Sequence, residues 1–111
     1  MKPLDLRSLA AGAVAADPGR PAMAIVHDSP DLRLVTFRIG RGQQVAPHTS
    51  TSSVALIVVS GTGYVSGAQG ETSVAPGDAV SYDPGERHGM RAGDDELVLL
   101  AVIAPRPGAR A

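Results

Sequence analysis

The sequence predicts an all-β protein whose short antiparallel strands form a sandwich or a closed barrel. Apolar runs of strand length, roughly four to eight residues, recur along the chain and are separated at short intervals by Gly, Pro, Asp and Ser. No amphipathic helix lies between them, which excludes a parallel α/β sheet, since parallel strands need long crossover connections. With 111 residues, the chain can build one hydrophobic core but not two stable domains.

The first element, in residues 1–20, is expected to be a short helix that begins near Leu4 and covers one end of the barrel. Lys2 and Arg7 precede a stretch of small residues, as in a secretory signal, but Asp5 interrupts the basic end and Ala outnumbers Leu and Phe in the middle. No apolar stretch reaches the length of a membrane span. We therefore expect a soluble cytoplasmic protein with no membrane partner.

The barrel itself is assigned to residues 21–104. Residues 23–27 and 32–39 are predicted to be two strands, on either side of the turn-forming segment 28–31. Two sets of side chains alternate along the second of these strands, so it has two different faces. After a glycine-rich turn, the chain is expected to extend again over residues 43–48.

A continuous apolar run with many β-branched side chains, residues 54–59, indicates a strand in the middle of the fold. It follows a run of hydroxyl residues, 49–53, which is interpreted as a polar bend at the barrel mouth. The tail, residues 105–111, holds two prolines and a glycine and is expected to be disordered. Turns that contain glycine or proline separate the remaining predicted strands, at residues 64–66, 71–74, 79–82 and 96–103.

Two stretches of the barrel resemble the two sequence motifs of the cupin superfamily. In the first stretch, Gly42, His48 and Gly61 fall where that family has a glycine, the first histidine of a His-x-His pair and a closing glycine. The matching residues of the second stretch are Gly77, Gly85 and His88. The resemblance implies a cupin-type, jelly-roll-like antiparallel β-barrel with a short N-terminal helical segment. It also implies that the two histidines converge inside the barrel.

The resemblance implies a metal site as well, but half of its ligands are replaced here. In metal-binding cupins, three histidines and a glutamate converge on a divalent ion. His48 and His88 match two of the histidines, whereas Ser50 occupies the second histidine position and Val54 the glutamate position. Gln44 shares strand parity with His48 and is expected to be able to point inward as a substitute ligand. The expected metal residues are therefore His48, His88 and Gln44, which would hold Zn, Fe, Mn or Ni only weakly.

Two main functions fit these residues, and no catalytic residue is identified. The first is the binding of a small molecule by His48, Ser50, Tyr82, His88 and Met90, which are expected to contact a ligand in the cavity. The alternative is a metal-dependent cupin enzyme, dioxygenase-like or isomerase-like, with an incomplete ligand set, or a metal-free acid/base catalyst that uses the two histidines. A third possibility is a purely structural subunit. We expect a homodimer, because small cupins pair through edge strands and N-terminal segments.

Charge and composition exclude several other classes of function. Ten basic and eleven acidic residues give a net charge of -1, and the arginines are spread along the chain, so the positive field that nucleic acids require is absent. The absence of cysteine excludes disulfides, thiolate metal sites and cysteine nucleophiles. One Phe, two Tyr and no Trp leave few aromatic surfaces for stacking bases or sugars.

Overall fold

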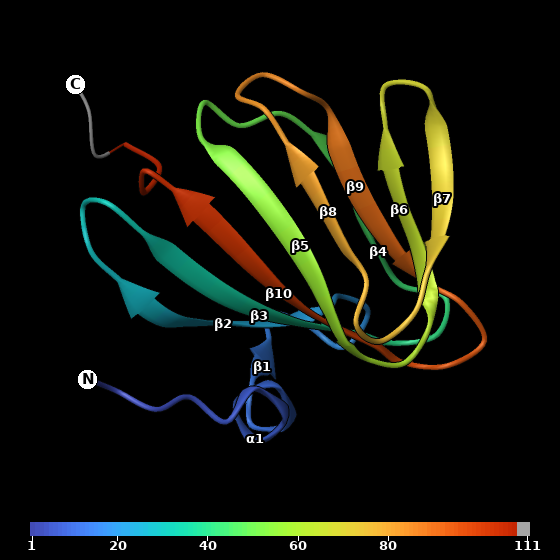
Figure 1. Ribbon diagram of the computed structural model, residues 1–111. Coiled ribbons are helices and arrows are strands. Elements are labelled where there is room, and N and C mark those ends of the chain that lie inside the picture. The colour runs from blue at the N-terminus through green and yellow to red at the C-terminus, as the bar shows by residue number, and fades with distance from the viewer. Residues whose placement is uncertain (109–111) are drawn as a thin grey trace.

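A computed structural model describes residues 1–108 of the chain, and within them two antiparallel sheets pack face to face (Figure 1). The larger sheet has the strand order β1-β2-β3-β10-β5-β8, and the smaller sheet has the order β4-β9-β6-β7. The elements are α1 (Leu6–Ala11), β1 (Val14–Ala15), β2 (Ala22–Asp28), β3 (Arg33–Ile39), β4 (Gln44–His48), β5 (Ser53–Ser60), β6 (Gly63–Gly67), β7 (Gly70–Val74), β8 (Ala79–Tyr82), β9 (His88–Ala92) and β10 (Leu97–Ala104). The predicted all-β, jelly-roll-like architecture is confirmed.

The core lies between the sheets and is built around the two apolar strands that the sequence indicated most strongly. β10 pairs with β3 on one side and with β5 on the other, so both of its edges are covered. Leu97 and Leu99 of β10 are fully buried, as are Leu56 of β5 and Ile39 of β3. Strands in this position are expected to be apolar without interruption when both of their faces are covered.

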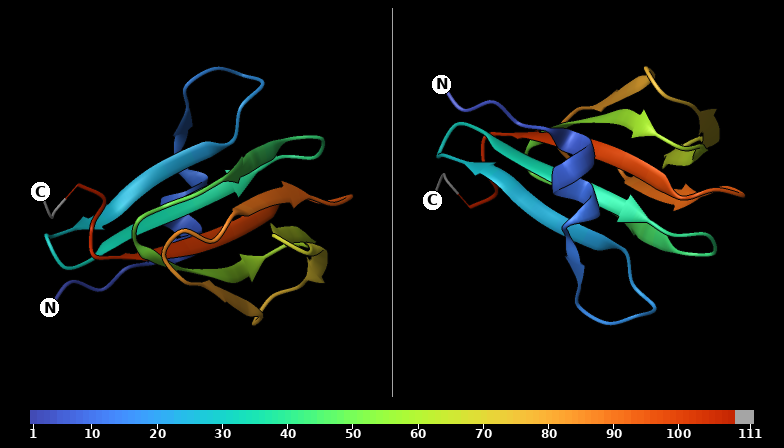
Figure 2. Two further views of the ribbon diagram at one scale, coloured as in Figure 1. Left: turned by 90° about the horizontal axis from the view of Figure 1, so that it is seen from above. Right: turned by 90° about the horizontal axis from the view of Figure 1, so that it is seen from below.

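The smaller sheet covers the inner face of the larger sheet. The helix α1 covers part of its outer face, because the helix lies across that face (Figure 2). Asp5 caps its N-terminus, and the Asp5 carboxylate accepts a hydrogen bond from the Ser8 N–H at 3.2 Å. Arg38 of β3 holds the other end by donating to the carbonyls of Ala10 and Ala13, both at 3.0 Å. The expectation that the helix covers one end of the barrel was therefore wrong. It covers a face, because Arg38 projects from the outer side of β3 and binds one carbonyl in the last turn of the helix and one just beyond its end.

The described part of the C-terminal tail, residues 105–108, is also attached to the body of the protein. The Ser52 hydroxyl donates to the carbonyl of Pro105 at 2.6 Å, and the Arg106 N–H donates to the carbonyl of Pro30 at 3.2 Å. The Arg106 guanidinium lies 3.8 Å from the Asp28 carboxylate. Disorder was expected for 105–111, and this stays a prediction for the tail beyond these contacts. Residues 109–111 lie outside the described residues.

Within the part of the chain that the structure describes, no helix is long and apolar enough to cross a membrane.

Candidate functional site

A cavity of about 380 Å³ is lined by residues of both sheets and of the segment that joins β4 to β5. Its mouth carries polar side chains from the hydroxyl run that follows β4, and His48 and His88 lie at its side. Its floor is apolar and comes from three strands, β5, β9 and β10. The floor residues are Val54, Leu56, Met90, Ala101 and Ile103. The volume is typical of small-molecule sites in proteins.

A β-bulge in β4 brings His48 to this cavity. Val45 of β4 pairs with Met90 of β9, and His48 pairs with His88, so β4 advances by three positions where β9 advances by two. Directly paired residues share one face of a sheet, and the extra residue therefore lets both Val45 and His48 face inward despite their odd spacing. The bulge contains Pro47. Proline has no backbone N–H, and at a bulge this removes no hydrogen bond between the two strands.

The same bulge turns Gln44 away from the cavity. Gln44 pairs with Arg91, whose side chain lies on the outer face over Tyr64, and Gln44 is exposed in a hollow lined by β2 and by the segment that precedes it. The expected inward orientation of Gln44 assumed regular alternation from Gln44 to His48. The extra residue breaks that alternation, so Gln44 does not join His48 and His88.

The imidazole rings of His48 and His88 face each other. Their centroids are 4.3 Å apart and their planes are tilted by 58°. His88 is buried, with 4% of its surface exposed, whereas His48 is exposed at the mouth. The Tyr82 ring packs behind His88 with a centroid distance of 5.0 Å. The two histidines thus form a pair with one deep member and one solvent-facing member.

Backbone carbonyls fix the tautomer of both rings. Nδ1 of His48 lies 3.0 Å from the carbonyl oxygen of Ala46, and Nδ1 of His88 lies 3.1 Å from that of Glu86. A carbonyl oxygen only accepts, so each Nδ1 carries a hydrogen and donates it. No buried side-chain nitrogen of the described residues lacks a hydrogen-bond partner, and no partner occupies Nε2 of His88. Nε2 of His88 is therefore open to the cavity, as is Nε2 of the exposed His48.

These donors do not fit a tightly bound divalent metal. Among residues 1–108, no three His, Cys, Asp or Glu side chains gather closely enough to hold an ion. Ser50 lines the mouth, but its hydroxyl oxygen accepts the Ser52 N–H at 3.1 Å, and Val54 contributes only apolar surface. Two imidazoles are half of the donor set of a structural tetrahedral site and fewer than the three protein ligands of a catalytic zinc site.

The cavity therefore brings together four of the residues predicted to bind a ligand: His48, Ser50, His88 and Met90. Tyr82 does not line it. The Tyr82 hydroxyl donates to the carbonyl of Ser66 at 2.8 Å, and its ring supports His88 from behind. Burial raises the pKa of Tyr82 above the usual 10.0, and the nearby Glu86 carboxylate adds to the rise.

Sequence reasoning missed several lining residues. Ala101 and Ile103 follow Leu97 and Leu99 at every second position of β10, and this alternation was a usable signal for an inward face. The same alternation along β3 could have indicated that Phe37 faces inward. No sequence feature indicated Pro107, because nothing local shows that the C-terminal tail folds back to the cavity.

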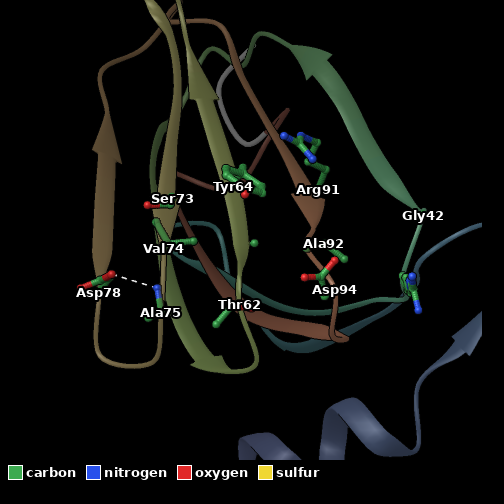
Figure 3. Close-up of a pocket in the computed structure, with 13 residues that line it drawn as sticks. Gly42, Thr62, Tyr64, Ser73, Val74, Ala75, Asp78, Arg91, Ala92 and Asp94 are labelled. Atoms are coloured by element: carbon green, nitrogen blue, oxygen red, sulfur yellow. Dashed lines mark hydrogen bonds between the residues drawn. The ribbon is translucent and has the colours of Figure 1, made fainter.

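A larger hollow of about 640 Å³ lies on the outer face of the smaller sheet (Figure 3). Two of its four charged side chains, Arg91 and Asp78, already have hydrogen-bond partners. The Arg91 guanidinium stacks 4.0 Å from the Tyr64 ring centroid and donates to both carboxylate oxygens of Glu71, at 2.7 and 3.0 Å. Asp78 accepts the Ala75 N–H at 2.9 Å. The cavity beside the histidines is mainly apolar with a few polar groups, which is more typical of a small-molecule site than this more polar hollow.

Comparisons with known proteins agree with this architecture. The sequence model described as Cupin domain matches residues 34–103, more than half of the chain. The structure is similar to that of TT1209 from Thermus thermophilus, which is 28% identical and has a TM-score of 0.85 over 96% of this chain and 100% of that one. KdgF from Halomonas sp. is 26% identical, with a TM-score of 0.77 over 85% and 87% of the two chains. An RmlC-like cupin protein from Desulfovibrio desulfuricans is 27% identical, with a TM-score of 0.79 over 95% and 97%. No curated protein sequence matches the chain.

Proposed function

Because this chain belongs to the cupin domain family, whose barrel encloses the cavity described above, we propose that it binds a small molecule there. The polar end of the ligand lies at His48 and His88, and its apolar body lies against the floor formed by β5, β9 and β10. The observation that carries the proposal is the facing pair of imidazoles, 4.3 Å apart, in which both Nδ1 atoms donate to backbone carbonyls and neither Nε2 has a hydrogen-bond partner among residues 1–108.

The division of the cavity into a polar side and an apolar floor supports binding of an amphiphilic molecule. Met90, Val54 and Leu56 are each no more than 5% exposed, and they form a rigid surface without polar groups. Contact with such a surface contributes about 25 cal/mol per Å² of apolar area removed from water. The two free Nε2 atoms and the hydroxyls of the mouth then select the orientation of the ligand.

The surroundings of the histidines favour binding over catalysis. A histidine that acts as general base toward a nucleophile is usually oriented by a carboxylate. Here both imidazoles are oriented by neutral backbone carbonyls, and among residues 1–108 no Asp or Glu lines the cavity. The hydroxyl of Ser50 already accepts a hydrogen bond from the backbone of its own turn.

Methyl-detected nuclear magnetic resonance tests the proposal with three ligands of one chain length: hexanoate, hexanamide and hexylamine. We expect at least one of them to shift the signals of Met90, Ile103 and both imidazoles together, and the shift to disappear in His48→Ala. His27→Ala is the matched control, because His27 lies on β2 and lines none of the cavity. If none of the three compounds moves these signals, or if the signals that move surround Arg91 instead, the proposed function is wrong.

A further inference from the structure

We infer that the ligand of this cavity has a neutral head group that donates hydrogen bonds, such as a primary carboxamide, an inference that rests on the proposed function and specifies its ligand. Nδ1 of His48 and Nδ1 of His88 donate to backbone carbonyls, at 3.0 and 3.1 Å. A neutral imidazole carries only one hydrogen, so each Nε2 keeps a lone pair and accepts. The two facing rings therefore present two acceptors to a ligand.

Both of these acceptors are accessible from the cavity. The two histidines line it, and their ring centroids are 4.3 Å apart. Although only 4% of His88 is exposed, no fully enclosed side-chain nitrogen of residues 1–108 lacks a hydrogen-bond partner. Nε2 of His88 has no partner among these residues, so it reaches the open space of the cavity. A ligand that displaces water from this space must donate to Nε2 or leave it unsatisfied, which costs free energy.

The hydroxyl groups beside the histidines can bind the acceptor of the same head group. Thr49, Ser50 and Thr51 line the cavity, and a hydroxyl both donates and accepts. Oγ of Ser50 accepts the Ser52 N–H at 3.1 Å, which still allows its own hydrogen to be donated. A primary carboxamide offers both kinds of partner. Its two N–H groups can donate to the imidazoles, and its carbonyl oxygen can accept from a hydroxyl.

Other head groups satisfy these atoms less well. A carboxylate only accepts hydrogen bonds, so it cannot bond to an Nε2 lone pair. An ammonium group donates, but it leaves water for a cavity in which the described residues place no carboxylate. A ketone or an ester has no N–H or O–H group, so both Nε2 atoms would lose water without a replacement. An alcohol has a single hydrogen to donate and satisfies one Nε2 at a time.

Nuclear magnetic resonance titrations with hexanamide and 2-heptanone test the inference, because the two molecules have the same shape and differ only where NH₂ replaces a methyl group. The ketone costs less to remove from water, so a cavity without acceptors would favour it. We expect hexanamide to bind about tenfold more tightly, as judged from the signals of Met90 and Ile103.

A matched pair of variants assigns this preference to the histidines. His48→Phe keeps an aromatic ring but removes its acceptor, so it should reduce the preference for hexanamide to about twofold or less. His48 is exposed, and its replacement should leave the fold intact. His27→Phe is the control and should keep the full preference, because His27 lines none of the cavity.

Nitrogen spectra of the imidazole rings provide a second readout, which does not depend on affinity. They are recorded at mildly alkaline pH, where an ordinary histidine is neutral. In the free protein, both rings should carry a hydrogen on Nδ1 and a lone pair on Nε2. Hexanamide should move the Nε2 signals and leave the Nδ1 signals in place, and 2-heptanone should move neither. A hydrogen on Nε2 of either ring in the free protein would overturn the inference.

The outcomes separate this inference from the proposed function. If 2-heptanone, hexanoate or hexylamine binds in the cavity as tightly as hexanamide, the inference of a neutral donor is wrong while the binding function stands. The inference is also wrong if His48→Phe retains the full preference for hexanamide. If no compound shifts the signals of Met90 and Ile103, the proposed function itself has failed.

Discussion

His48 and His88 face each other across β4 and β9 because one extra residue in β4 shifts the pairing register between Val45 and His48. The bulge requires a close approach of the two strands at Gly89. A Cβ atom at Gly89 would lie 3.1 Å from Pro47 Cα and 2.9 Å from Ser66 Oγ, closer than ordinary van der Waals contact. Pro47 in β4 and Gly89 in β9 thus support the same local geometry.

We therefore expect Gly89→Ala to destabilise the protein by about 1–3 kcal/mol, because the added methyl group overpacks the bulge. Urea denaturation measures the loss. The matched control is Gly67→Ala in β6, where the nearest atom to a Cβ would be Tyr82 Cε1 at 3.8 Å. Equal stability of the two variants would show that the close packing around Gly89 does not matter.

Two glycines of the cupin-like motifs offer a second comparison, since Gly61 and Gly42 have φ angles of 77° and 79°. Alanine at either position takes a left-handed backbone conformation, which costs about 1–2 kcal/mol. At Gly61 the Cβ would also overlap the backbone carbonyl of Glu96, whereas at Gly42 it would meet open space.

We expect Gly42→Ala to lose about 1–2 kcal/mol of stability, and Gly61→Ala to lose more than about 4 kcal/mol or to fail to fold. Circular dichroism during chemical denaturation compares them. A Gly61→Ala protein as stable as Gly42→Ala would contradict the strand packing at Glu96.

The raised pKa of Tyr82 predicts that the folded protein loses stability at alkaline pH. Its pKa is raised in the folded protein, mainly by burial, so the folded state holds the phenol proton at pH values where the unfolded chain releases it. The stability contributed by Tyr82 is therefore complete below the unfolded value near 10.0 and is lost as the pH rises through the folded pKa.

In Tyr82→Phe this alkaline loss should disappear. At neutral pH the variant should be about 0.5–1.5 kcal/mol less stable, because the hydrogen bond to the Ser66 carbonyl is removed. Above pH 10.0 the difference from the wild type should shrink. Unfolding free energies measured across this range provide the check, and a difference that does not change with pH would contradict the burial of the phenol.

Metal content gives a further prediction. Because the described residues supply only two imidazoles as suitable donors in the cavity, protein expressed with added iron, manganese, nickel or zinc should carry well below one ion per chain. Elemental analysis of purified protein measures this. One ion per chain that is lost in His48→Ala would instead favour the metal-dependent enzyme that the cupin resemblance also allowed.

The architecture was predictable because its strongest signals are local. The apolar runs of β5 and β10 indicated central strands, and the spacing of Gly42, His48 and Gly61 indicated the family. The strand that carries the second histidine, β9, was not predicted. Its sequence, His-Gly-Met-Arg-Ala, lacks β-branched residues, and pairing with β4 and β6 rather than intrinsic propensity makes it a strand.

The site was less predictable, because a single inserted residue changes which side chains face inward. Strand parity alone places Gln44 and His48 on one face, and the bulge between them reverses this. Tyr82 was placed in the cavity wall. It faces inward, as its pairing partner Val54 does, but its ring packs behind His88 and does not line the cavity. The homodimer stays a prediction, which light scattering can check.

A crystal structure of the protein grown with 6-bromohexanamide tests the central claim most directly. We predict one bromine anomalous peak inside the cavity above Met90 and Ile103, with the amide N–H donating to Nε2 of His48 or His88. A bromine peak confined to the outer hollow beside Arg91, or imidazole rings that point away from each other, would contradict it.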